Sequence, residues 1–129
     1  MNRRAFLFAG VAAAALPAAA WARGGGIEVI YVGGWDCPYC TKWKNEYKAD
    51  WLASPEFKRV TWIEIDPPRL REAYQPRYWP ADLADVLEQV PRKHGTPRFL
   101  IVKGGRIVSN ELGVNKWAIT LDRLHKLLG

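Results

Sequence analysis

The feature that most constrains this chain is a pair of cysteines, Cys37 and Cys40, separated by Pro38 and Tyr39. They are the only 2 cysteines in the 129-residue sequence. A disulfide across so short a span is possible at the first turn of a helix, but it is easily reduced. Pro38 suits the first helical position because its fixed φ is already helical and its missing N–H would have no partner there. The pattern therefore predicts that a helix starts at Cys37.

This placement gives the two sulfurs different roles. At a helix N-terminus, Cys37 would face unpaired backbone N–H groups and the positive end of the helix dipole, which favour the thiolate over the thiol. Cys40 would lie one turn further on and be more shielded, so it would keep its proton more readily. We expect Cys37 to attack a substrate disulfide and Cys40 to resolve the mixed disulfide. The pattern thus indicates a redox-active dithiol.

Other uses of the cysteine pair fit less well. A structural disulfide that closes so short a loop would remove little entropy from the unfolded chain. A zinc site would need both His94 and His125 as further ligands, and their wide separation matches no common zinc-site spacing. Two thiolates would suit Cu(I). A module that binds copper or a protein partner without turnover is therefore the alternative to an enzyme.

Residues 1–22 are predicted to be a secretory signal peptide. Arg3-Arg4 supply its positive start, Phe6 to Leu16 form an apolar run too short to span a bilayer, and Ala20-Trp21-Ala22 resembles a cleavage site. The start also resembles the twin-arginine export motif, but the general secretory route reads a similar pattern, so the route stays open. We expect residues 23–129 to form one domain in the periplasm, where disulfides persist, with no stable membrane insertion after processing.

The charge pattern is mild. The formal net charge of the whole chain is +6, and two of the positive charges, Arg3 and Arg4, belong to the predicted leader. The remaining basic residues are scattered and no nucleic-acid recognition motif is present, so we expect no nucleic-acid partner. A modest positive surface leaves acidic protein partners open.

The first half of the domain alternates strand, helix and strand. Ile27–Val32 is a mostly apolar, β-branched run typical of a central strand covered on both faces. Arg59–Asp66 reads as a second strand, ended by two prolines. Two strands joined by a helix imply a parallel, right-handed crossover. Aromatic residues at intervals of four predict that the helix packs one aromatic stripe inward, with the members Tyr39, Trp43, Tyr47 and Trp51.

The second half is predicted to hold two helices and a hairpin. Leu83–Val90 has helical periodicity. Arg98–Val102 and Arg106–Asn110 flank a glycine pair, which indicates an antiparallel hairpin. Trp117–Leu128 is expected to be the last helix. Arg69–Pro80 carries three aromatic residues among prolines, and it is either packed against the domain or a partner-binding surface.

The order of these elements over residues 27–128 resembles the thioredoxin superfamily. Two motifs carry the resemblance: Cys37-Pro38-Tyr39-Cys40, and Gly95-Thr96-Pro97 directly before the hairpin. The resemblance implies an α/β fold, with a mixed central sheet of about four strands flanked by helices. It also implies that the bond before Pro97 is cis and that the backbone of Thr96 pairs with a substrate polypeptide as an added strand.

The same resemblance implies the site residues. Cys37 and Cys40 would be catalytic, and no metal ion or cofactor would be needed. The residues that would contact the substrate flank the cysteines in the chain or in the fold, and they are Trp35, Pro38, Tyr39, Thr96 and Pro97.

Some positions depart from the family pattern. Thioredoxins have a buried aspartate six residues before the first cysteine and a lysine on the next strand, which help to deprotonate the resolving thiol. Tyr31 and Trp62 occupy those positions here, so Glu64 or water would have to take over. The Cys-Pro-Tyr-Cys tetrapeptide is also similar to that of glutaredoxins, but Leu112-Gly113-Val114 replaces their glutathione-binding glycine pair. Glutathione is therefore not expected as a cofactor.

Taken together, the sequence predicts an exported thiol-disulfide oxidoreductase that reduces disulfides in periplasmic partner proteins through Cys37 and Cys40. A membrane electron donor would re-reduce the pair. An oxidant or an isomerase is the alternative direction, because proteins with this type of motif span about 150 mV in reduction potential.

Overall fold

The computed structural model describes residues 26–129. Residues 1–25, which include the predicted signal peptide, lie outside the described residues, so that hypothesis stays a prediction. Among the described residues, no helix is long and apolar enough to cross a membrane.

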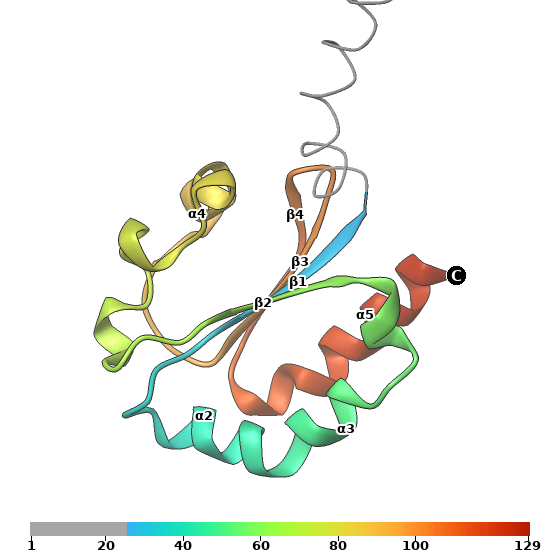
Figure 1. The fold of residues 1–129 in the computed structure, drawn as a ribbon, viewed down its shortest axis with the longest axis horizontal. Coiled ribbons are helices and arrows are strands. Elements are labelled where there is room, and N and C mark those ends of the chain that lie inside the picture. The colour runs from blue at the N-terminus through green and yellow to red at the C-terminus, as the bar shows by residue number, and fades with distance from the viewer. Residues whose placement is uncertain (1–25) are drawn as a thin grey trace, which may run out of the picture.

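A single mixed sheet of four strands, in the order β2-β1-β3-β4, forms the centre of the domain (Figure 1). β1 (Ile27–Val32) and β2 (Thr61–Ile65) are parallel. β3 (Arg98–Lys103) is antiparallel to β1, and β4 (Arg106–Leu112) is antiparallel to β3. This is the mixed sheet of about four strands that was predicted.

β1 is apolar at every position except the buried Glu28, because both faces of the sheet are covered. Val29 and Tyr31 face one core cluster, which also contains Cys37 and Cys40. Ile30 and Val32 face the other cluster. Successive side chains of β1 thus pack into two separate core clusters. A strand that is covered on both faces needs a largely continuous apolar run, whereas a strand with one exposed face alternates apolar and polar residues.

Helices cover the two faces unequally. α2 (Pro38–Trp43), a π-helical turn (Lys44–Lys48) and α3 (Ala49–Leu52) form one continuous helical stretch. This stretch and α5 (Trp117–Leu128) lie on one side of the sheet, and α4 (Ala84–Gln89) lies on the other (Figure 1). The cysteines therefore start the helical layer on the first side.

The predicted aromatic stripe of the first helix is half wrong. Trp43 and Trp51 are buried at 0% and 2% exposure, but Tyr39 and Tyr47 are 63% and 39% exposed. Steps of four residues drift around an α-helix of 3.6 residues per turn. The π-helical turn Lys44–Lys48 is wider and compensates for that drift, which brings Trp43 and Trp51 to the same face. Tyr47, within this turn, points toward α5 and stays partly exposed.

The second strand is shorter than the predicted range Arg59–Asp66. Residues Glu56–Arg59 form a 3-10 turn, and β2 covers only Thr61–Ile65. As the edge strand of the sheet it pairs on one side only, with β1.

The segment Arg69–Pro80 contains two short 3-10 turns and packs mainly onto the sheet face opposite the cysteines, whereas Leu70 packs against the cluster that contains them. Trp79 is buried at 6% exposure, and its indole N–H donates to the Ala73 carbonyl at 2.7 Å. Tyr74 and Tyr78 pack against the same core cluster. Of the two hypotheses for this segment, these contacts favour packing against the domain over a partner-binding surface.

Candidate active site

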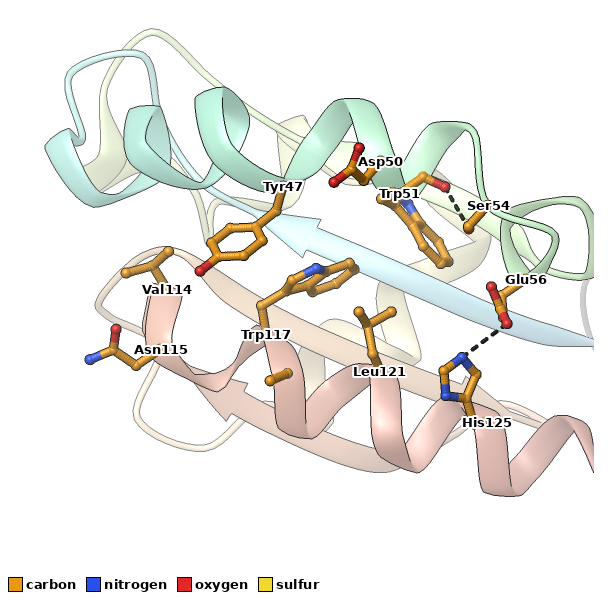
Figure 2. A pocket seen from close by; sticks show the side chains of 11 residues that line it. Tyr47, Asp50, Trp51, Ser54, Glu56, Val114, Asn115, Trp117, Leu121 and His125 are labelled. Carbon is orange, nitrogen blue, oxygen red and sulfur yellow. Dashed lines mark hydrogen bonds and ion pairs between the residues drawn. The ribbon is translucent and has the colours of Figure 1, made fainter.

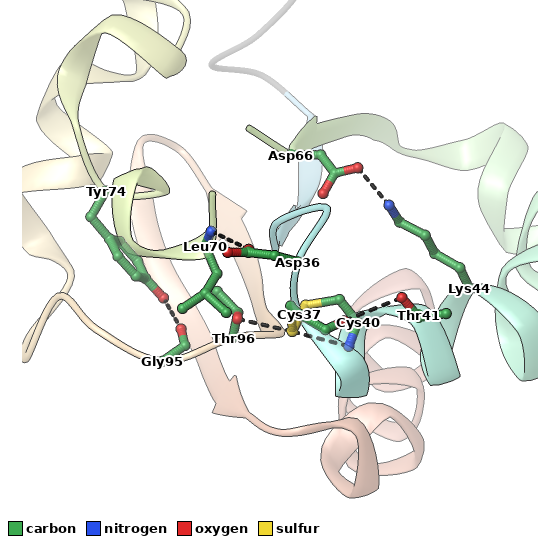
Figure 3. Close-up of a disulfide and its surroundings, with 10 residues drawn as sticks. All are labelled: Asp36, Cys37, Cys40, Thr41, Lys44, Asp66, Leu70, Tyr74, Gly95 and Thr96. Atoms are coloured by element: carbon green, nitrogen blue, oxygen red, sulfur yellow. Dashed lines mark hydrogen bonds and ion pairs between the residues drawn. A yellow bond between two sulfur atoms is a disulfide. The ribbon is translucent and has the colours of Figure 1, made fainter. Parts of the chain in front are cut away.

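Cys37 and Cys40 form a disulfide at the start of α2, with their Cα atoms 5.2 Å apart (Figure 3). Cys37 is the N-cap residue, and Pro38 is the first residue of the helix. The helix was predicted to start at Cys37 and begins one residue later, but Pro38 takes the first helical position and Cys37 lies at the N-terminus as expected. This geometry leaves the first sulfur beside the free N–H groups of the helix start.

One of those N–H groups points at the sulfur. The backbone N–H of Cys40 donates to Cys37 Sγ at 3.1 Å. The carbonyl of Cys37 accepts from the Thr41 N–H at 3.0 Å, which closes the first turn. A backbone donor aimed at Cys37 Sγ would bind a thiolate more strongly than a neutral thiol, because hydrogen bonds to charged acceptors are the stronger ones. The local geometry thus favours Cys37 as the nucleophile.

The loop before β3 supplies a second donor to the same sulfur. The Thr96 hydroxyl donates to Cys37 Sγ at 3.1 Å, and the peptide bond from Thr96 to Pro97 is cis, the form that the resemblance implies. Pro97 is buried and Thr96 is half-buried. The sequence analysis assigned only a backbone role to Thr96 and missed this side-chain contact.

Exposed aromatic side chains flank the disulfide. Both cysteines are almost fully buried, at 2% and 0% exposure for Cys37 and Cys40. Trp35 and Tyr39, on either side of Cys37 in the chain, are 67% and 63% exposed, and Pro38 is exposed as well. Large exposed aromatic groups beside a buried reactive group are suited to contact an incoming chain.

The loop that leads into the cysteines is tied to the chain that follows β2. The Trp35 N–H donates to the Pro67 carbonyl at 3.0 Å, and Asp36 Oδ1 accepts from the Leu70 N–H at 2.7 Å (Figure 3). A side chain on Gly34 would collide with the Leu70 backbone, so the two segments approach closely. Asp36 stands between Trp35 and Cys37 in the chain, and no local signal in the sequence indicated its contact with Leu70.

Tyr31 lies where thioredoxins have a buried acid, and it cannot serve as a base. Its side chain is buried, stacks on Trp43 at a centroid distance of 4.8 Å, and its hydroxyl has no hydrogen-bond partner among the described residues. Burial, with smaller contributions from Asp66 and Glu64, raises the pKa of Tyr31 far above its usual value. The phenol therefore stays protonated at neutral pH.

Two carboxylates lie near Tyr31. Glu64, the substitute suggested by the sequence, is exposed and accepts hydrogen bonds from Lys48 at 3.0 Å and from the Trp62 indole at 2.9 Å. Asp66, at the end of β2, pairs with Lys44 at 2.5 Å through one oxygen, and its other oxygen is buried without a partner among residues 26–129. The structure thus points to Asp66, not Glu64, as the partly buried carboxylate on this side of the sheet.

The histidines do not contact the sulfurs. The side chain of His94, which precedes the Gly95-Thr96-Pro97 motif and could be expected to tune the sulfurs from there, is exposed and makes no hydrogen bond or ion pair in the described part of the chain. His125 lies on α5, where it pairs with Glu56 at 2.9 Å. In residues 26–129, no group of three His, Cys, Asp or Glu side chains is arranged to hold a metal ion.

A cavity of about 560 Å³ lies between α3 and α5 (Figure 2). Trp51 and Trp117 line it, and the Glu56–His125 pair closes one end. Its only serine, Ser54, is occupied as a local cap, since it donates to the Trp51 carbonyl and accepts from the Phe57 N–H. The cavity contains no cysteine and no serine paired with a base. The cysteine pair is therefore the candidate active site.

Comparison with known proteins identifies the fold. No protein-family model and no curated protein sequence matches the chain. Among solved structures, it is similar to the thioredoxin Mala s 13 of Malassezia sympodialis, with a TM-score of 0.55 and 13% identity over 81% of this chain and 76% of that one. A thioredoxin from Thermus thermophilus has a TM-score of 0.53 and 23% identity, over 87% of this chain and 82% of that one. The periplasmic thioredoxin SoxS from Paracoccus pantotrophus has a TM-score of 0.51 and 15% identity, over 76% of this chain and 94% of that one. These likenesses confirm the predicted α/β class and show that the chain has the thioredoxin fold.

Proposed function

We propose that this protein is a thiol-disulfide oxidoreductase that reduces disulfides in partner proteins. The observation that carries the dithiol chemistry, but not its direction, is the disulfide at the start of α2, where the Cys40 N–H and the Thr96 hydroxyl both donate to Cys37 Sγ. Both donors would stabilise the negative charge of a thiolate on Cys37 once the pair is reduced.

The reaction begins with the reduced pair. The Cys37 thiolate attacks one sulfur of the substrate disulfide, which forms a mixed disulfide and releases the other substrate sulfur as a thiolate. Cys40 then loses its proton and attacks Cys37 Sγ, which forms the Cys37–Cys40 disulfide and releases the second substrate thiolate. Two electrons pass to the substrate, and a reductant must restore the pair.

Protein substrates fit the surroundings of the pair. Trp35 and Tyr39 offer exposed aromatic surface on either side of Cys37. The cis-proline loop would present the Thr96 backbone to an extended substrate segment, which would add as a strand. We also assign Pro38, which is exposed, and Pro97, which is buried beneath the loop that carries Thr96, to the substrate site.

We assign this activity to the periplasm, with a membrane electron donor and with reduction as the direction. The leader-like pattern of residues 1–22 supports export. The similar structure from Paracoccus pantotrophus is described as a periplasmic thioredoxin, which agrees with that location. Detection of the processed protein in a periplasmic fraction tests it, and retention in the cytosol would contradict it.

Insulin reduction by the processed protein, with dithiothreitol as electron source, tests the activity. Cys37→Ser should abolish the acceleration, and Cys40→Ser should accumulate the mixed disulfide because resolution is lost. Full turnover by Cys37→Ser would contradict the assignment. Stoichiometric retention of Cu(I) without any catalysis would instead identify the binding module that the sequence left as an alternative.

The reduction potential of the Cys37–Cys40 pair decides the direction. Equilibration against glutathione buffers should give a value near about −270 mV for a reductase of the thioredoxin type. A value near about −120 mV would identify an oxidant of partner thiols and reverse the proposed electron flow.

A further inference from the structure

A buried arginine lies directly behind the loop that contacts the cysteine pair. Arg98, the first residue of β3, follows Pro97 and is only 4% exposed. Side chains alternate along a strand, so Arg98 shares its face with Leu100, which packs in the core cluster on the α4 side. Phe99 faces the other way, into the cluster that contains the cysteines. The guanidinium group therefore lies on the sheet face opposite the disulfide.

The guanidinium group of Arg98 donates hydrogen bonds to the loop that precedes Thr96 and to two side chains beside it. Its Nη2 donates to the carbonyls of Arg92 and His94 at 3.0 and 3.2 Å. Its Nε donates to the Tyr74 hydroxyl and its Nη1 to Asn110 Oδ1, both at 2.7 Å. All four acceptors are uncharged, and no carboxylate of residues 26–129 forms an ion pair with Arg98. The planar fork of the guanidinium group satisfies these diverging acceptors, which a single ammonium group cannot do.

Tyr74 connects this arginine to the residue next to Thr96. Its hydroxyl accepts from Arg98 and donates to the Gly95 carbonyl at 2.7 Å (Figure 3). Burial raises the pKa of Tyr74, and Arg98 offsets this only in part. The hydroxyl thus remains a donor at neutral pH. Tyr74 belongs to the segment Arg69–Pro80, whose role the sequence left unassigned.

Two residues of the loop have left-handed backbone angles, which glycine adopts freely but a residue with a side chain does not. Arg92 has a φ of 47° and Gly95 a φ of 91°. A positive φ is unfavourable for a residue with a side chain such as Arg92. Arg98 and Tyr74 bind the carbonyls of residues 92, 94 and 95, and the next side chain is the Thr96 hydroxyl that donates to Cys37 Sγ. The chain of contacts is continuous from Arg98 to the sulfur.

We propose that Arg98 and Tyr74 are positioning residues of the dithiol: they hold the 92–95 loop so that the Thr96 hydroxyl stays on the Cys37 sulfur and favours its thiolate. This inference deepens the proposed function and rests on it for its biological meaning. It also gives the segment Arg69–Pro80 a role, as a brace for the cis-proline loop.

The test compares two tyrosines of the same segment. Tyr74→Phe removes only the hydroxyl that bridges Arg98 and Gly95. Tyr78→Phe removes a hydroxyl that donates to Glu72 at 2.8 Å and does not touch the loop, so it is the matched control. The readout is the rate at which iodoacetamide alkylates Cys37 as a function of pH, in the full reduced protein carrying Cys40→Ser.

Tyr74→Phe should move the titration of Cys37 to higher pH. At pH values below the midpoint of the titration, the thiolate fraction should fall by about three- to tenfold, which is the effect of one hydrogen bond. Tyr78→Phe should leave the titration unchanged. If Tyr74 only stabilises the fold, Tyr74→Phe will lower the unfolding free energy and leave the titration where it was, which would overturn the inference.

A double-mutant cycle tests whether the effect passes through Thr96. In a Thr96→Val background, Tyr74→Phe should cause no further shift of the Cys37 titration. Additive shifts would overturn the proposed route. Arg98→Lys keeps the positive charge and loses the planar guanidinium group. It should therefore move the Cys37 titration to higher pH, as Tyr74→Phe does. An unchanged Cys37 titration in Arg98→Lys would also count against the inference. If Arg98→Lys does not fold, the Tyr74→Phe cycle alone decides.

These readouts separate the inference from the proposed function. Alkylation reports the state of Cys37 whether or not the protein turns over disulfides. Absence of insulin reduction by the wild-type protein would contradict the proposed function, whereas an unchanged titration in Tyr74→Phe would contradict only the positioning role.

Discussion

The Thr96 hydroxyl donates a hydrogen bond to the Cys37 sulfur across 3.1 Å, although the two residues are 59 positions apart in the chain. Together with the Cys40 N–H, also 3.1 Å from that sulfur, it gives Cys37 two donors. A thiolate accepts hydrogen bonds more strongly than a disulfide sulfur, so both donors stabilise the reduced state of the pair more than the oxidised state. This relationship leads to the first prediction.

Thr96→Val keeps the shape of the side chain and removes the hydroxyl. The reduced state should lose stabilisation, and the reduction potential of the pair should become more negative by up to about 30 mV, a tenfold change in the redox equilibrium. Thr96→Ser, which keeps the hydroxyl, is the control and should stay near the wild-type potential. Equal potentials for Thr96→Val and wild type would mean that the hydroxyl does not act on the thiolate.

Asp36→Ala removes the acceptor of the Leu70 N–H and should lower the free energy of unfolding by about 1 kcal/mol. Asp36→Asn retains a side-chain oxygen in nearly the same place and should lose less. Urea denaturation of the oxidised proteins measures both. Equal losses in the two variants would attribute the effect to the charge of Asp36 and not to its hydrogen bond.

Lys44→Met leaves Asp66 without its cation. Since the other oxygen of Asp66 is already buried without a partner among the described residues, the cost should be about 1–3 kcal/mol of unfolding free energy. Adding Asp66→Asn should recover part of the loss, because no unpaired carboxylate then remains.

The control for this pair is Lys42→Met. It breaks the exposed pair of Lys42 with Glu46, where both side chains are about half exposed, and should lower stability much less than Lys44→Met does, because solvent screens the pair. A similar loss for Lys42→Met and Lys44→Met would show that burial of the Lys44–Asp66 pair does not matter.

Tyr31→Phe tests an unusual buried phenol. The folded state holds the phenolic proton more tightly than the unfolded chain, whose tyrosines titrate near about pH 10. This contribution to stability is fully present below that pH and is lost as the pH rises toward the raised pKa of the folded state. Between pH 8 and pH 11 the wild type should therefore lose about 1.4 kcal/mol more stability than Tyr31→Phe.

At pH 7 the same substitution should change stability little, because the Tyr31 hydroxyl has no partner in the described structure and its removal leaves no donor or acceptor unpaired. Chemical denaturation at the three pH values measures both effects. A parallel loss of stability in the two proteins at high pH would indicate that Tyr31 ionises as easily when folded as when unfolded.

Several elements could be predicted because their signals are local. Ile27–Val32 and Trp117–Leu128 match the predicted ranges at both ends, since the burial of β1 on two faces and of α5 on one face imposes a periodicity that the sequence displays. Pro38 marked the start of α2 because its preference for the first helical position is a property of the residue itself.

The errors arose where the backbone departs from regular geometry. Tyr39 and Tyr47 share the four-residue spacing of Trp43 and Trp51, but only the two tryptophans are buried, and a π-helical turn lies between them. Nothing in the spacing signals such a turn. The position of Tyr74 was equally open, because prolines and short 3-10 turns leave Arg69–Pro80 without a period to read.

The sequence by itself determined the order of the elements, the fold class and the identity of the cysteine pair, because residue preferences and spacing act over a few positions. Only the tertiary structure decided that the Thr96 hydroxyl reaches Cys37, that Tyr74 holds Gly95, and that Asp66 pairs with Lys44. Each of these contacts joins distant parts of the chain through loops, so its geometry depends on how sheet and helices pack and not on the pattern of either segment.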